Sequence, residues 1–281
     1  MRGHPMTYAS IMVGLDLGDG SRERTRLAAQ LAGRLQGRLI GIASREPDYL
    51  RGYDDGSAFG ATTMNDIRDA ALADLAEIEQ TFREVAGTGR LIEWRSDLQD
   101  PEIFAAEQSR AADLIVLGRR GGEDFSDPRF ALNAGRALMS LGKPVLVVPT
   151  GVDHLSLKRV VVAWKNTLQT RRALSDAMPL LKLADEVQVV RIAVAENAAQ
   201  DNEDLEDVVR YLELHGVNAE AFRKAQNGAS VALALQGVAK DFDADLIVSG
   251  AYGHTRIREW FFGGVTRALL DHCPICCLMS H

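Results

Sequence analysis

The sequence predicts an α/β protein built as two tandem domains, each an α/β sandwich around a five-stranded parallel sheet of the Rossmann-like kind. Two observations predict it. Short apolar runs alternate with longer amphipathic stretches along the chain, a pattern that favours βαβ crossovers and hence parallel sheets. In addition, the run DLIVLG at residues 113–118 returns as DLIVSG at residues 245–250. A repeat at half the chain length indicates that both halves share one fold.

The repeat continues on both sides of that run. The segment GRALMSLGKPVLVVP (135–149) corresponds to TRALLDHCPICCLMS (266–280), and IMVGLDL (11–17) corresponds to VVVAWKN (160–166). Between the copies, PTGVDHLSLK (149–158) interrupts the apolar pattern with Pro, Gly and polar residues, which is typical of a linker. We therefore expect an N-terminal domain at residues 1–150 and a C-terminal domain at residues 151–281.

The strands and helices expected in each half follow from periodicity and capping signals. In the first half these are strands at 11–15, 38–43, 91–95, 113–117 and 145–148, and helices at 21–35, at 65–85 and from Asp100-Pro101. In the second half they are strands near Val160, Val187, Ala219, Leu246 and Ile275, and helices from Thr167, Asp204, Ser230 and Gly264. Residues 51–63 are rich in Gly, Asp and Ser and are expected to form a surface loop.

Composition narrows the function classes. The chain has 281 residues, of which 46% are hydrophobic and 25% charged, the balance of a globular protein. Its net charge of −7 argues against nucleic acid as a partner, because phosphate-backbone binding relies on a surplus of Lys and Arg. No apolar run approaches the roughly 20 residues that cross a bilayer, and no secretory signal is visible. We expect a cytoplasmic protein that does not bind membranes.

A glycine-rich segment follows the strand at 246–249. It reads GAYGHTRIREWFFGGVTRALL, with Gly250 and Gly253, then nine residues, then Gly263 and Gly264 at the start of a helix. Glycine lets the backbone approach a ligand closely, and the free N–H groups at a helix start attract anions. The carboxyl end of a parallel strand is also the usual ligand site of an open α/β sheet. The segment therefore predicts a site for a phosphate-bearing ligand.

This segment resembles the ATP-binding signature of the universal stress protein family: Gly, two residues, Gly, nine residues, Gly, then Ser or Thr. The three glycine intervals match, whereas Gly264 stands where ATP-binding members usually carry Ser or Thr. The resemblance implies an adenine nucleotide, ATP or AMP, as ligand. The nucleotide-binding residues that it implies are Ala163, Lys165, Gly250, Gly253, His254, Gly263, Gly264, Val265 and Thr266.

The family's second marker is an acidic residue after the first strand of each domain, which the resemblance assigns to the adenine or ribose. Asp16 has this place in the first half, and Lys165 has it in the second. A lysine cannot accept hydrogen bonds, although it can meet a phosphate. The first half retains Asp16, Gly118 and Gly121 but has Leu132 and Asn133 where the second half has Gly263 and Gly264. We expect this weaker N-terminal site to bind triphosphate poorly or not at all.

The three cysteines, Cys273, Cys276 and Cys277, lie too close together for a disulfide framework. A CxxC spacing supplies half of a zinc site, but the other half is missing. Strand alternation puts Cys276 and Cys277 on opposite faces. We expect buried, apolar-like cysteines and no metal, and their role stays open.

The favoured function is a stress-response sensor that binds ATP or AMP at the C-terminal glycine loop. An interaction or scaffold protein of the same fold with degenerate sites is the alternative. A weak ATP hydrolase comes third, because no catalytic base or Mg²⁺ ligand set is visible. The resemblance also implies an intramolecular pseudo-dimer in which residues 144–148 pair with 275–280. Whether two chains form a homodimer, and which protein partner is bound, stays open.

Overall fold

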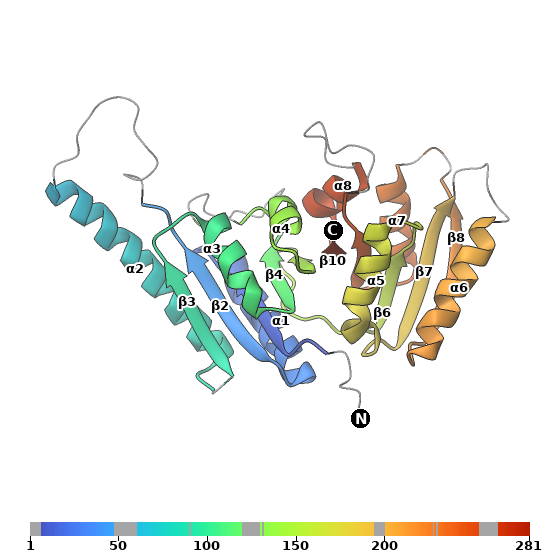
Figure 1. The fold of residues 1–281 in the computed structure, drawn as a ribbon, viewed down its shortest axis with the longest axis horizontal. Helices are drawn as coiled ribbons and strands as arrows, with labels where there is room; N and C mark the ends of the chain where they lie inside the picture. The colour runs from blue at the N-terminus through green and yellow to red at the C-terminus, as the bar shows by residue number, and fades with distance from the viewer. Residues whose placement is uncertain are drawn as a thin grey trace.

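The computed structural model describes residues 7–47, 61–89, 91–119, 130, 132–193, 200–226, 228, 230–252 and 264–281. Strands and helices alternate in both halves, and each half contributes its strands to one continuous sheet (Figure 1). The elements of the first half are β1 (Ser10–Gly14), α1 (Gly20–Leu35), β2 (Arg38–Ser44), α2 (Ala61–Ala86), β3 (Ile92–Asp97), α3 (Pro101–Gln108), the 3₁₀ turn η2 (Ser109–Ala111), β4 (Leu114–Gly118), α4 (Ala134–Ser140) and β5 (Val145–Val148). Those of the second half are β6 (Arg159–Ala163), α5 (Leu168–Leu181), β7 (Glu186–Ala193), α6 (Gln200–Leu214), β8 (Ala219–Ala225), α7 (Val231–Asp241), β9 (Leu246–Gly250), α8 (Gly264–His272) and β10 (Cys276–Ser280).

The sheet has ten strands in the order β3-β2-β1-β4-β5-β10-β9-β6-β7-β8. Neighbouring strands within each half are parallel, as the βαβ alternation predicts. The two halves meet at an antiparallel pairing of β5 with β10, in which Leu146 lies opposite Leu278. The expected α/β fold and the expected pairing of the last strand of each half are confirmed. This pairing also removes two strand edges that would otherwise expose unpaired backbone groups.

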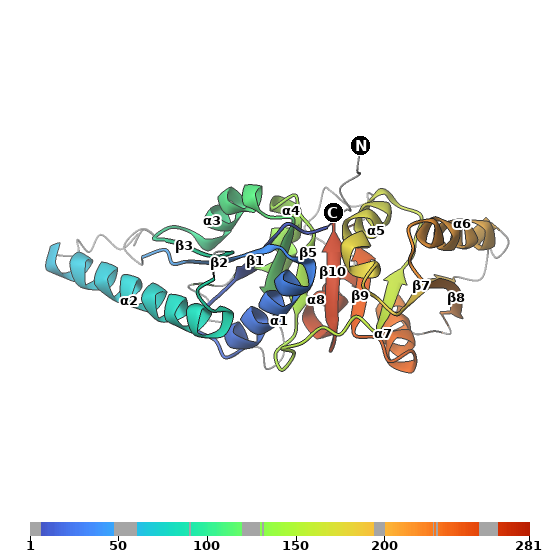
Figure 2. The ribbon, with the colours of Figure 1, turned by 90° about the horizontal axis from the view of Figure 1, so that it is seen from below.

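Helices cover both faces of the sheet (Figure 2). Residues of α1, α2, α5 and α6 pack in one buried cluster with alternate residues of the strands, such as Ile11 and Val160. Residues of α3, α4, α7 and α8 pack on the other face with the intervening strand residues, such as Met12 and Val161. Because the central strands are buried on both faces, their sequences are continuous apolar runs.

Two predicted boundaries were wrong by a few residues. The expected surface loop at 51–63 extends too far, because α2 already begins at Ala61, and the rest of that segment lies outside the described residues. The helix expected from Asp204 begins at Gln200. Both errors lie in the first turn of a helix, where the residues are mostly polar and apolar periodicity gives no signal. Figures 1 and 2 show that the long α2 extends beyond the β3 edge of the sheet.

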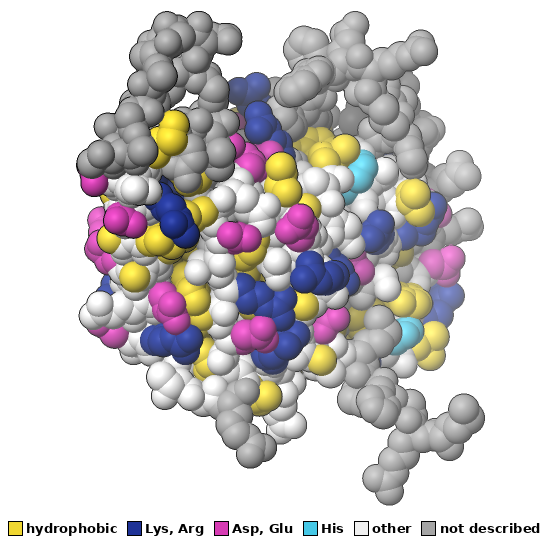
Figure 3. All heavy atoms as spheres, turned by 60° about the vertical axis from the view of Figure 1, so that its left-hand side comes forward, with side chains coloured by type: hydrophobic (Ala, Val, Ile, Leu, Met, Phe, Trp, Pro, Cys, Tyr) yellow, Lys and Arg dark blue, Asp and Glu magenta, His cyan; other side chains and the backbone are white. Residues whose placement is uncertain are grey.

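The charges on the face at the β3 end of the sheet are mixed. Figure 3 shows basic and acidic side chains interspersed there, and Glu93 of β3 pairs with Arg38 of β2 at 3.0 Å and with Arg95 at 2.7 Å. The described part of this face therefore has no Lys/Arg surplus of the kind that binds nucleic acid. Among the described residues, no helix is both long and apolar enough to cross a membrane.

Candidate functional site

The predicted site residues that the structure describes lie at the carboxyl edge of the sheet, at two places. In the second half, β6 lies beside β9 with Ala163 opposite Ser249, so that Ala163 and Gly250 end neighbouring strands. In the first half, β1 lies beside β4, and Gly118 ends β4. Gly121, Gly253, His254 and Gly263 lie outside the described residues.

Asp16 of the first half is already bound within the protein. Its Oδ1 accepts hydrogen bonds from the Gly18 amide at 2.9 Å and from the Ser21 hydroxyl at 2.8 Å. Its Oδ2 forms an ion pair with Nη2 of Arg24 at 3.2 Å. Both side chains are about nine-tenths buried, with 10% and 9% of their surface exposed. The one acidic residue that the family resemblance singles out therefore has an internal cation against it.

The guanidinium of Arg24 also fills the space next to Gly118. Its Nε donates to the Gly14 carbonyl at 3.2 Å, and its Nη2 donates to the Ser21 hydroxyl at 2.9 Å. A Cβ at Gly118 would lie 2.5 Å from Nη1 of Arg24, closer than atoms can approach. A side chain at Gly118 would therefore have to displace the guanidinium of Arg24. Sequence reasoning missed Arg24, although its place three residues before Leu27 puts it on the buried stripe of α1.

The start of α4 is likewise satisfied by the protein. Asn133 is the N-cap, and its Oδ1 accepts from the Arg136 amide at 3.1 Å. The side chain of Leu132 packs toward Gly14, where a Cβ would meet it at 2.9 Å. The Asn133 side chain thus already accepts from one amide of this helix start, and poor triphosphate binding there stays a prediction.

The second half is arranged differently around its equivalent strands. Lys165 follows β6 as Asp16 follows β1, and it is exposed. Thr167 caps α5 by accepting from the Thr170 amide at 3.3 Å. The first turn of α5 packs directly on β9, since a Cβ at Gly250 would lie 2.6 Å from the Thr170 nitrogen and 2.7 Å from the Gln169 carbonyl carbon. Here a helix backbone, and not a side chain, requires the glycine.

The start of α8 is open by comparison with α4. A Cβ added at Gly264 would meet nothing within 4 Å among the described residues. Thr266 is buried in the first turn, and its hydroxyl accepts from the Tyr252 amide at 3.4 Å, while Val265 is half-buried. Gln169 is 4% exposed, and within the described ranges its Oε1 has no hydrogen-bond partner. As far as the structure describes the chain, this edge thus combines a helix start without a covering side chain, an exposed cation and a buried acceptor.

Tyr252 connects this edge to the first half. Its hydroxyl donates to the Gly135 carbonyl of α4 at 3.4 Å, and its backbone has a φ of +53°. Burial, followed by the charge of Asp271, raises the pKa of Tyr252 to about 12. The predicted ligand loop of one half therefore begins in contact with the first turn of α4 in the other half.

The comparisons with known proteins decide the family. The sequence profile described as "Universal stress protein family" matches the chain twice, at residues 7–149 and 156–281. The chain belongs to the universal stress protein family. The recognition from the glycine spacing and the tandem organisation are thereby confirmed, whereas the individual binding residues stay predictions.

Relatives within the universal stress protein family agree with this assignment. Universal stress protein Slr1230 of Synechocystis sp. is 24% identical over 217 residues, which cover 76% of this chain and 68% of that protein. A universal stress protein from Archaeoglobus fulgidus has a similar fold, with a TM-score of 0.70 at 16% identity, covering 97% of this chain and 98% of its own. The functionally unknown protein PA1789 of Pseudomonas aeruginosa has a TM-score of 0.55 at 17% identity, with coverages of 97% and 92%.

The cysteines of this universal stress protein are part of the core. All three are buried, and Cys276 and Cys277 belong to the core clusters on opposite faces of the sheet, as strand alternation predicts. Burial and the nearby charge of Asp245 raise the pKa of the Cys276 thiol to about 12. No group of three or more metal-ligating side chains comes together in the described parts of the chain.

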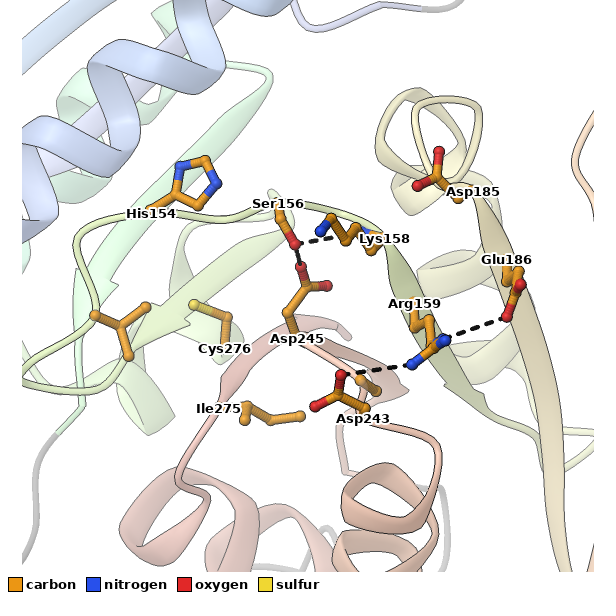
Figure 4. A pocket seen from close by; sticks show the side chains of 12 residues that line it. His154, Ser156, Lys158, Arg159, Asp185, Glu186, Asp243, Asp245, Ile275 and Cys276 are labelled. Atoms are coloured by element: carbon orange, nitrogen blue, oxygen red, sulfur yellow. Dashed lines mark hydrogen bonds and ion pairs between the residues drawn. The ribbon is translucent and has the colours of Figure 1, made fainter.

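A pocket of about 590 Å³ lies at the opposite, amino-terminal edge of the second half's strands (Figure 4). The linker borders it, and Asp245 holds the linker by accepting from the Ser156 hydroxyl and from the Leu157 amide, the latter at 2.7 Å. Arg159 forms ion pairs across the pocket with Glu186 at 3.3 Å and Asp243 at 3.4 Å. These charged groups fasten the linker and the strand ends to one another.

Proposed function

We propose that this universal stress protein binds an adenine nucleotide, ATP or AMP, at the carboxyl edge of its second half and acts as a sensor of that ligand. The observation that carries the proposal is the start of α8, where no described side chain lies within 4 Å of a Cβ added at Gly264. Such a helix N-terminus attracts a phosphate through its free amides and its dipole.

Two further features support an anionic ligand at this edge. Lys165 is exposed at the end of the neighbouring strand, where a cation favours phosphate over a ribose hydroxyl. Gln169, whose backbone packs against Gly250, adds a buried side-chain acceptor without a partner among the described residues, which a donor such as an exocyclic amino group of a base would satisfy. Together these groups match the two ends of a nucleotide, a phosphate and a base.

Isothermal titration with ATP and AMP, backed by native mass spectrometry of the purified protein, tests the proposal. The matched variants are Gly264→Asp and Gly264→Asn, which have nearly the same shape. No described atom lies within 4 Å of a Cβ at Gly264, and Asp is also tolerated at a helix start, so both variants should fold. Gly264→Asp places a negative charge against the phosphate and should weaken binding by about tenfold or more, equivalent to about 1.4 kcal/mol. Gly264→Asn should change affinity by less than about threefold.

A second pair of variants tests the cation. Lys165→Glu should weaken nucleotide binding, whereas Lys182→Glu makes the same charge change at the other, exposed end of α5 and should not. Equal losses in both variants would mean that only the net charge matters. No bound nucleotide in the wild-type protein by either method would reject the proposal.

A second candidate function is an interaction or scaffold protein that has lost nucleotide binding. The tight packing of Gly250 against α5 favours it, because this glycine is then required for helix packing and not for a ligand. Under this alternative, titration with ATP or AMP gives no binding heat for the wild type or for Gly264→Asp. The variant also captures protein partners as the wild type does.

A further inference from the structure

The first half carries an occupant of its own at the place where open α/β sheets bind ligands. From β1 the chain moves outward to β2 and β3, and then returns to the other side of β1 to form β4. The strand order therefore reverses between β1 and β4, and the carboxyl ends at such a switch point border the usual ligand crevice. Gly14, Asp16 and Gly118 lie at these ends, and the guanidinium of Arg24 lies among them.

We propose that Arg24 is a specificity-determining residue that closes the first-half crevice, so that a nucleoside site exists there only when Arg24 is removed. In the wild-type protein, the guanidinium of Arg24 would occupy the place that the ribose hydroxyls take in the variant. This inference concerns the first half alone and does not depend on nucleotide binding by the second.

The two carboxylate oxygens of Asp16 have different roles. One holds the loop, and the other would bind a ligand. Oδ1 is used by the Gly18 amide and the Ser21 hydroxyl, and these bonds remain without Arg24. Within the part of the chain that the structure describes, Oδ2 accepts a hydrogen bond only from Arg24. Removal of the guanidinium thus frees one carboxylate oxygen of a carboxylate that stays positioned.

The space and the acceptors that Arg24 leaves have a definite chemical preference. The Gly14 carbonyl also loses its Arg24 donor, so that two acceptors become free on one side of the crevice. Gly118 has no side chain to refill the space that Nη1 occupies. Neighbouring hydroxyls of a ribose are neutral donors, and carboxylates bind such hydroxyls at the ligand crevice of other open α/β sheets. A cation or a nucleoside fits this chemistry, whereas a free anion does not.

Comparison with the second half shows that the exclusion of a nucleoside by Arg24 concerns the first half. The residue that contacts Gly250 there is Thr170, through its backbone nitrogen, and Lys165 stands in the place of Asp16. Among the described residues of that half, neither a carboxylate nor a guanidinium takes these places. Within the described ranges, the combination of an acceptor pair with a removable donor is found in the first half.

The experiment compares adenosine binding by the full-length wild-type protein and Arg24→Ala, using titration calorimetry and native mass spectrometry. Because adenosine carries no phosphate, its affinity measures binding to the two acceptors, Oδ2 of Asp16 and the Gly14 carbonyl. Arg24→Ala should bind one more adenosine per chain than the wild type, and adenosine should raise its melting temperature. The double variant Arg24→Ala with Asp16→Asn should lose most of that gain, at least tenfold in affinity. Arg22→Ala, which removes an exposed arginine of the same helix paired with Glu84, should bind as the wild type does.

The outcomes separate this inference from the proposed function. A wild type that binds no adenosine, together with a gain in Arg24→Ala, supports the inference even if the second half binds nothing. Should Arg24→Ala fold poorly, Arg24→Gln keeps donors for Asp16 while it vacates the space beside Gly118, and a smaller gain is expected. A folded variant with no added adenosine, or two adenosines already bound by the wild type, overturns the inference.

Discussion

The two halves use glycine at the end of corresponding strands for different reasons. At Gly118 the missing side chain makes room for the guanidinium of Arg24, whereas at Gly250 it makes room for the backbone of α5. The residue after the first strand of each half also differs in charge. In the first half it is Asp16, which is buried in an ion pair, and in the second half it is Lys165, which is exposed. Two copies of one fold thus solve the same packing problem once with a side chain and once with a helix, and only the side chain can be removed without moving the backbone.

The largest expected effect comes from adding a methyl group to each glycine. Gly250→Ala should destabilise the protein by about 3 kcal/mol, because the new Cβ overlaps backbone atoms of Gln169 and Thr170 that cannot rotate away. Gly118→Ala should cost about 1 kcal/mol, because the end of the Arg24 side chain can move. Urea unfolding of both variants gives the two free energies.

A double variant sharpens the same contrast. When Arg24→Ala is already present, Gly118→Ala should add almost nothing to the loss of stability, since the clashing atoms are gone. Equal costs of the two glycine substitutions would show that the halves do not differ in the way described.

The second comparison concerns the residues after the first strand of each half. Asp16→Asn leaves Arg24 buried without its counter-charge and should cost about 2 kcal/mol, below the usual value for a buried pair because each side chain keeps about a tenth of its surface exposed. Lys165→Met changes an exposed residue and should stay within about 0.5 kcal/mol of the wild type. Chemical denaturation at pH 7 measures both, and a large effect at Lys165 would contradict the exposed placement.

The third comparison concerns the helix starts. Asn133→Ala removes the N-cap of α4 and should destabilise the protein by about 1 kcal/mol. At the corresponding position, Gly264→Ala should change stability by no more than about 0.5 kcal/mol, since no side-chain cap is lost. Thermal unfolding distinguishes them, and a smaller effect at Asn133 than at Gly264 would be inconsistent with the capping geometry.

The smallest expected effect lies at the contact between the halves. The folded pKa of Tyr252 is raised to about 12, above its ordinary value of 10.0, so the protonated phenol favours the folded state. That contribution is complete below pH 10 and is lost as the pH rises through about 12. Melting temperatures between pH 9 and about 12 should therefore fall more steeply for the wild type than for Tyr252→Phe. Parallel curves would show that Tyr252 does not titrate in this range.

The sequence was sufficient to predict the repeat and the alternation, because these follow from apolar periodicity and from two copies of one motif. The pairing of residues 144–148 with 275–280 was expected from the family resemblance. Asp100, for example, was expected to start a helix, and its side chain accepts from the amides of Glu102 and Ile103. Helix ends at polar turns were placed less well, as at Ala61.

The occupant of the first-half site was not predicted. Arg24 looks like one of several solvent-facing arginines in the sequence RERTR, and only its spacing from Leu27 hints at burial. The reason for glycine at Gly250 was equally hidden, since it depends on how closely α5 approaches β9 in space. Local pattern indicates which residues form an element, whereas the distance between two packed elements depends on the whole core.

The antiparallel seam between β5 and β10 has an evolutionary consequence. In a symmetric homodimer joined by such a strand pair, each substitution appears on both sides of the axis, so neither copy can change alone. Joining the copies in one polypeptide frees each from that constraint. One domain can become purely structural while the other keeps or alters its ligand site. A single gene then encodes an asymmetric pair of domains.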